Sequence, residues 1–73
     1  MNEIEMIPVV SSSVESIGYC EEIQILKVKF LKGGVYEYKN VPLMEFEQLH
    51  NASSIGSYLN RNIVNNYPYE RVG

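Results

Sequence analysis

The sequence predicts an α+β fold in which a three-stranded antiparallel β-meander is packed by two short helices. Residues 26–30 and 35–39 alternate in character, and the Gly33-Gly34 pair between them is typical of a β-hairpin turn. After Pro42, apolar residues recur at helical spacing instead. With 73 residues the chain is expected to form one domain, residues 1–73.

The two ends of the chain are expected to be extended. Residues 1–10 form an N-terminal arm that Pro8 keeps from becoming a long regular element, and residues 65–73 form a C-terminal tail. The arm has too many apolar residues for a free tail, so it should be covered by its own domain or by a second copy of the chain. These residues are Ile4, Met6, Ile7, Val9 and Val10.

The first strand is expected at residues 14–20, after the polar break of Ser11-Ser12-Ser13. Ile17 and Tyr19 would share one face, while Gly18 would let a neighbouring backbone approach closely. The hairpin of residues 24–42 supplies the other two strands. Their side chains divide between faces, with Leu26, Val28 and Phe30 together on one strand and Tyr36 and Tyr38 together on the other.

Two helices should cover the meander, the first at residues 43–50 and the second from Ile55 to about Val64. Pro42 suits the start of the first, and the serines at 53–54 offer a cap for the second. Gly56 costs a helix about 1 kcal/mol relative to alanine. A close approach to another helix or to the sheet is the expected compensation.

Composition narrows the class of protein. One cysteine and one histidine exclude an internal disulfide and a four-ligand Cys/His zinc site, so neither a metal nor another cofactor is expected. No stretch approaches the roughly 18 apolar residues of a membrane span, and the acidic N-terminus is unlike a signal peptide. We therefore expect a cytoplasmic protein without a membrane partner. Because small domains are marginally stable, we also expect a homo-oligomer.

The net charge of −3 argues against long nucleic acid as a partner, since such binding relies on phosphate neutralisation by several cations. Four of the six basic residues fall on the hairpin, where they could form a phosphate track. Solvent-facing lysines that protect a sheet edge are the favoured alternative. The four are Lys27, Lys29, Lys32 and Lys39.

No residue pattern indicates catalysis, and we expect no enzymatic activity. His50 lies at a predicted helix end, where an imidazole can satisfy the last carbonyl groups. Cys20 precedes Glu21 and Glu22, the opposite of the electropositive setting that a nucleophilic thiol requires.

The candidate ligand-binding residues are Tyr36, Tyr38, Tyr58, Asn60 and Arg61. Six tyrosines and no tryptophan are a biased choice of aromatic residue, and tyrosine suits recognition surfaces. A tyrosine could stack on a base, the asparagine could read its edge and the arginine could hold a phosphate. Alternatively, the tyrosines of the hairpin pack beneath the helices and Arg61 forms a surface ion pair.

Several pieces of the chain, in this order, resemble the KTSC domain, a small module found at the C-terminus of some lysyl-tRNA synthetases and as a stand-alone bacterial or phage protein. The resemblance spans roughly residues 8–69. The matching pieces are the serine run, Ile17-Gly18-Tyr19, Phe30 with the glycine turn, Tyr36-Glu37-Tyr38, Val41-Pro42 and Ala52 to Asn60, leading to Ile63. Two positions depart from the family pattern: Cys20, often aspartate, and Val64, often basic.

The resemblance implies no established function, only a suggestion of RNA binding. Together with the acidic charge, it favours a non-catalytic module that holds a nucleotide moiety, either short RNA or a small or cyclic nucleotide. The alternative is a bacterial or phage protein–protein interaction module, whose tyrosines and apolar arm would contact a protein partner and not a nucleotide.

Overall fold

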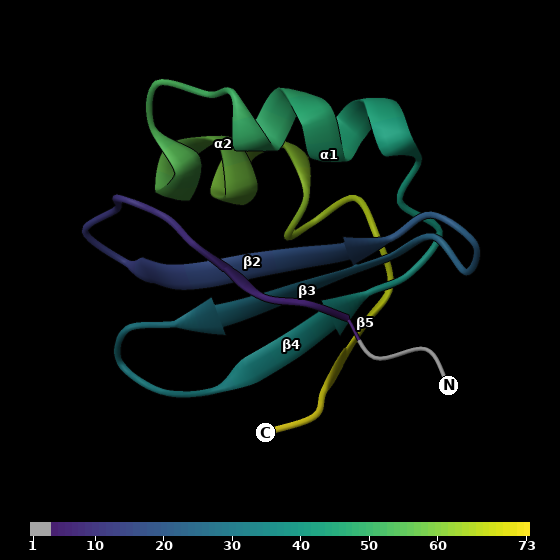
Figure 1. Cartoon of the computed structure of the whole chain (residues 1–73), viewed down its shortest axis with the longest axis horizontal. Coiled ribbons are helices and arrows are strands. Elements are labelled where there is room, and N and C mark those ends of the chain that lie inside the picture. Colours follow the sequence, from purple (N-terminus) through teal and green to yellow (C-terminus); the bar gives the residue numbers. More distant parts are fainter. Residues whose placement is uncertain (1–3) are drawn as a thin grey trace.

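The computed structural model describes residues 4–73 and has two helices lying over one face of an antiparallel sheet (Figure 1). Within these residues the sheet has five strands, in the order β1-β2-β3-β4-β5, so each strand pairs with its neighbour in sequence. The strands are β1 (Ile7–Pro8), β2 (Val14–Cys20), β3 (Ile25–Phe30), β4 (Val35–Tyr38) and β5 (Tyr69–Arg71), and the helices are α1 (Leu43–His50) and α2 (Ile55–Asn62). The α+β class is confirmed.

The expected count of three strands was wrong, because both ends of the chain add a short strand to the meander. In β1, Ile7 lies opposite Ile17, and in β5, Tyr69 lies opposite Tyr38. These segments of two and three residues are too short to carry a readable alternation. They pair with backbone groups that would otherwise form the exposed edges of the meander.

The core lies between the sheet and the helices. Ile17, Leu26 and Val28 face this core from the strands and are fully buried. Leu49 of α1 and Leu59 of α2 meet them from the other side. The alternation of the hairpin therefore predicted correctly which side chains face inward.

Residues 4–6 of the N-terminal arm lie against β2 of their own domain. A Cβ at Gly18 would come within 2.6 Å of the carbonyl oxygen of Glu5 and of the side chain of Ile4. Because Ile17 and Tyr19 face the helices, Gly18 faces the opposite side of the sheet. The close backbone approach expected at Gly18 is thus present; residues 1–3 of the expected arm lie outside the described residues.

The helix boundaries depend on local caps. Ser54 is the N-cap of α2, and its hydroxyl accepts a 3.4 Å hydrogen bond from the Ser57 amide. A Cβ at Gly56 would lie 2.5 Å from Oγ of Ser13. The close approach at Gly56 is therefore to the turn before β2 and not to a helix or a strand. Across residues 4–73, neither helix has the length and apolar character needed to cross a membrane.

Candidate ligand-binding cleft

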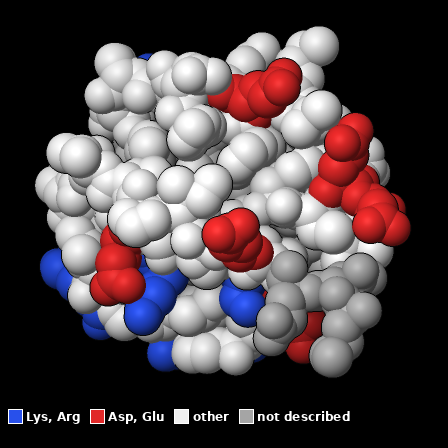
Figure 2. Space-filling view, in the orientation of Figure 1, with Lys and Arg blue, Asp and Glu red and all other residues white. Residues whose placement is uncertain are grey.

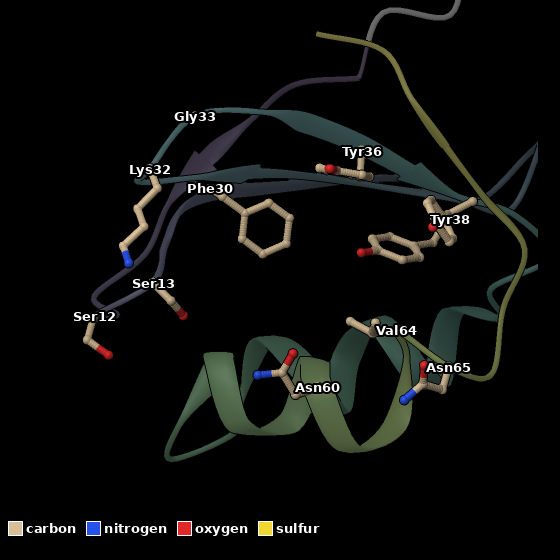
Figure 3. A pocket seen from close by; sticks show the side chains of 11 residues that line it. Ser12, Ser13, Phe30, Lys32, Gly33, Tyr36, Tyr38, Asn60, Val64 and Asn65 are labelled. Carbon is tan, nitrogen blue, oxygen red and sulfur yellow. The ribbon is translucent and has the colours of Figure 1, made fainter.

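A cleft with a volume of about 650 Å³ lies between the sheet and α2 (Figure 3). The sheet contributes an aromatic wall, and α2 with the turn after it contributes a mostly polar wall. One end is bordered by the turn before β2 and by the β3–β4 hairpin turn. The cleft is lined by Ser12, Ser13, Phe30, Lys32, Gly33, Tyr36, Tyr38, Asn60, Val64, Asn65 and Tyr69.

The aromatic wall follows from the register of the sheet. Tyr36 and Tyr38 lie opposite Val28 and Leu26, so both point to the helix side. The ring of Phe30 meets Tyr36 edge-on, with centroids 5.6 Å apart. The ring of Tyr69 lies 5.8 Å from both tyrosines. These rings form an apolar wall that can stack on a flat ligand group.

Tyr38 is the deepest residue of this wall. Its exposed fraction is only 3%, and its hydroxyl points into the cleft without a hydrogen bond to any atom of residues 4–73 (Figure 3). Burial, with the nearby Tyr36 and Tyr69 adding to it, raises the pKa of Tyr38 above its ordinary value. The phenol therefore stays protonated at neutral pH and can donate a hydrogen bond to a ligand.

Asn60 and Asn65 bring side-chain amides to the opposite wall. The amides of three other asparagines donate to backbone carbonyls four residues earlier, at 2.8 Å for Asn51, 3.2 Å for Asn62 and 2.9 Å for Asn66. Among the described residues, the amides of Asn60 and Asn65 have no such bond and line the cleft. An amide can both donate to and accept from the edge of a nucleobase.

Lys32 is the single cation among the described residues that line the cleft, and none of those residues is acidic. Its side chain lies at the end lined by Ser12 and Ser13 (Figure 3). Two of the other three hairpin lysines form ion pairs, with Nζ of Lys29 3.2 Å from Glu15 and Nζ of Lys39 3.4 Å from Glu70. These pairs favour the solvated-edge interpretation of the lysines over a phosphate track.

The charges are arranged unevenly on the face seen in Figure 2. Basic side chains gather along its lower edge, on the sheet side, whereas acidic side chains are spread more widely over the same face. The net charge of −3 is therefore not spread evenly over this face.

Two of the predicted ligand-binding residues lie in a second hollow of about 190 Å³, which is lined by α2 and the turn before it. This hollow contains Tyr58 and Arg61, whereas Asn60 points to the main cleft. The hydroxyl of Tyr58 donates to the carboxylate of Glu45, and it lies 2.8 Å from Oε1 of Gln48. Burial and the bond to Glu45 raise the pKa of Tyr58 to about 12. Tyr58 thus ties α2 to α1.

The structure divides the five predicted residues into two groups: Tyr36, Tyr38 and Asn60 share the main cleft, and Tyr58 and Arg61 lie outside it. Arg61 forms no ion pair with an acid of residues 4–73.

Sequence reasoning missed further lining residues. Phe30 could have been found, because it alternates with Leu26 and Val28 and so shares the face of the tyrosines. Lys32 was considered only as one of four hairpin lysines that could form a phosphate track. Asn65 and Tyr69 carried no such signal, since Asn65 lies in a turn and Tyr69 in the short strand β5.

Comparison with known proteins identifies the family. The family model of the KTSC domain matches residues 10–67. An uncharacterized protein of Stutzerimonas stutzeri is 43% identical over 51 residues, which cover 70% of this chain and 72% of that protein. A lysine–tRNA ligase of Trichormus variabilis is 38% identical over 61 residues, covering 84% of this chain but only 11% of the ligase.

Among solved structures, a KTSC domain protein of Yersinia pestis superimposes with a TM-score of 0.94 at 28% identity, covering 97% of this chain and all of that one. The matched region includes most of the cleft-lining residues described above. This chain therefore belongs to the KTSC domain family.

Proposed function

We propose that this protein is a non-catalytic binding module that holds a nucleotide moiety in the cleft between the sheet and α2. The observation that carries the proposal is the hydroxyl of Tyr38, which has no protein partner among residues 4–73 and points into an aromatic cleft. A ligand acceptor placed against this hydroxyl would gain one hydrogen bond, with a net contribution of about 0.5–1.5 kcal/mol.

The other lining residues suit the same ligand. Tyr36 and Phe30 offer ring surface for stacking on a base, which is worth about 1–3 kcal/mol per base. Asn60 and Asn65 can pair with the polar edge of the base. An aromatic wall facing two amides is a more selective environment than an apolar pocket, because each amide requires a matching donor or acceptor.

Size and charge favour a short ligand over a long RNA. A long polyanion needs several cations along its track, and the described lining of the cleft holds Lys32 alone. One of the relatives is named a lysine–tRNA ligase, which acts on tRNA; this chain matches 11% of it. A small module attached to such an enzyme is compatible with recognition of one or a few nucleotides.

The proposal is tested by calorimetric titration with single nucleotides and with short RNA. We expect binding tighter than millimolar, and we expect Asn60→Ala to weaken it by about tenfold, the effect of losing one to two hydrogen bonds. Arg61→Ala is the matched control, because Arg61 is the next residue of α2 but lines the second hollow and not the main cleft. Absence of binding, or loss on Arg61→Ala alone, would contradict the proposal.

A protein–protein interaction module is the second candidate. Val10 is fully exposed, and the exposed Met44 and Leu43 lie at the start of α1, close to the turn that contains the exposed Ile23. This candidate predicts a stable complex with a protein partner that Met44→Lys weakens, with no change in chain stability when nucleotides are added.

A further inference from the structure

We infer that the cleft takes a nucleoside carrying a single phosphate, with the phosphate at Lys32, Ser12 and Ser13 and the base toward Tyr38 and Asn65. This inference rests on the proposed function and specifies the ligand class and its orientation. The first argument is the separation of polar groups along the cleft. Lys32 and the two serines lie at one end, and the hydroxyl of Tyr38 with the amide of Asn65 lies toward the other (Figure 3).

The two ends differ in the chemistry that they can recognise. An ammonium group with two hydroxyls donates hydrogen bonds to an anion, and Lys is a common phosphate ligand. The other end has the neutral phenol of Tyr38, a residue that is 3% exposed, together with the amide of the exposed Asn65, and these groups suit the neutral edge of a base. The aromatic residues between the two ends, Phe30 and Tyr36, lie where stacking would take place.

The number of phosphates follows from the number of cations. Lys32 is the only basic residue in the described lining of the cleft. Arg71 does not line the cleft; it lies over the ring of Tyr36 at 5.9 Å, and its Nε donates to the carbonyl oxygen of Gly73 at 3.0 Å. Within the described lining, a second or third phosphate would therefore gain no further ion pair and would add repulsion in an acidic protein.

A nucleoside that carries one phosphate has two sources: a free nucleoside monophosphate and the phosphorylated end of a short RNA. The cleft is open to solvent at the hairpin end, where Lys32 is exposed. A terminal nucleotide could therefore enter while the rest of the strand stays outside. The experiment distinguishes the two sources by comparing free monophosphates with a 5′-phosphorylated trinucleotide.

The test is a set of calorimetric titrations with nucleosides, monophosphates and triphosphates of the same four bases. We expect each bound monophosphate to bind at least about tenfold more tightly than its nucleoside, the contribution of one charge-assisted hydrogen bond. The triphosphate should bind no more tightly than the monophosphate. Lys32→Gln should lower monophosphate affinity to that of the nucleoside and leave nucleoside affinity unchanged.

Lys27→Gln is the matched control, since Lys27 lies on the opposite face of the sheet and should change neither affinity. A trinucleotide that binds like the monophosphate, and depends equally on Lys32, supports the inference with RNA as the source. If nucleosides bind as tightly as monophosphates, or if Lys32→Gln has no effect on affinity, this inference is overturned but the proposed function is not. Failure of every nucleoside and nucleotide to bind would overturn the proposed function with it.

Discussion

At the scale of single residues, tyrosines in this protein have two different roles. Tyr58 and Tyr67 both donate to the carboxylate of Glu45, the latter at 2.9 Å, and so connect α1, α2 and the segment before β5. Tyr38 is as deeply buried as an apolar core residue, yet its hydroxyl has no partner among residues 4–73. Tyrosines whose hydroxyl groups form hydrogen bonds within the protein stabilise the fold, whereas the hydroxyl of Tyr38 is available for a ligand.

The variant Tyr38→Phe separates these roles. Removing a hydroxyl without a protein partner should leave the free energy of unfolding unchanged or raise it by about 1 kcal/mol. Nucleotide affinity should fall by about tenfold, as expected for one lost hydrogen bond. Urea unfolding and calorimetric titration measure the two quantities. A loss of stability with full affinity would show that the hydroxyl serves the fold.

Alkaline pH should destabilise the chain through Tyr58. Its pKa is about 12 when folded, against 10.0 ordinarily, because burial and the bond to Glu45 disfavour the phenolate. The resulting stabilisation is fully present below pH 10 and is lost as pH rises through about 12, because the unfolded chain then releases the proton first.

Urea unfolding midpoints measured from pH 8 to pH 12 test this dependence. Tyr58→Phe should flatten the decline above pH 10, while the raised pKa of Tyr67 leaves part of it in place. Tyr36→Phe is the control, because the Tyr36 hydroxyl has no hydrogen bond within residues 4–73. An identical decline in the wild type and in Tyr58→Phe would contradict this account.

At the scale of secondary-structure elements, long patterned segments could be predicted and short ones could not. The seven residues of β2 and the eight of α1 were predicted with the bounds that the structure has. In contrast, β1 and β5 form only because their backbones complete the ladder of the neighbouring strand. Such pairing is a property of the folded sheet and leaves little trace in two or three residues.

The contact between the N-terminal arm and β2 gives an element-scale prediction. Gly18→Ala should lower the free energy of unfolding by about 1–3 kcal/mol, because the new methyl group would overlap the backbone at Glu5. In a chain that begins at Ile7 the same substitution should cost much less, since the overlapping atoms are gone. The two effects are compared by urea unfolding of all four chains. Equal costs in both backgrounds would mean that the arm does not lie there in solution.

At the scale of the whole molecule, the candidate site was only partly predictable. Alternation placed Tyr36 and Tyr38 on one face, but the rotation of α2 decides that Asn60 faces the sheet and Arg61 the other hollow. Neighbouring residues of a helix differ in direction by about 100°. The contribution of Asn65 depends on the turn after α2, which no periodicity predicts.

Self-association stays a prediction for the whole chain. The exposed apolar side chains of Val10 and Met44 offer surface for a second copy. Sedimentation velocity at micromolar concentration should give a mass above 8.4 kDa, and Met44→Lys should lower it. A monomer at every concentration would contradict the expectation without affecting the cleft.

The central claim is that the cleft between the sheet and α2 binds a nucleotide. The most direct measurement is a titration of the isotope-labelled chain with nucleoside monophosphates, followed by two-dimensional amide NMR. The account predicts shifts concentrated at Lys32, Tyr36, Tyr38, Asn60 and Asn65, with the signals of Ser57 and Arg61 unmoved. Shifts at the second hollow alone, or none at millimolar ligand, would contradict it.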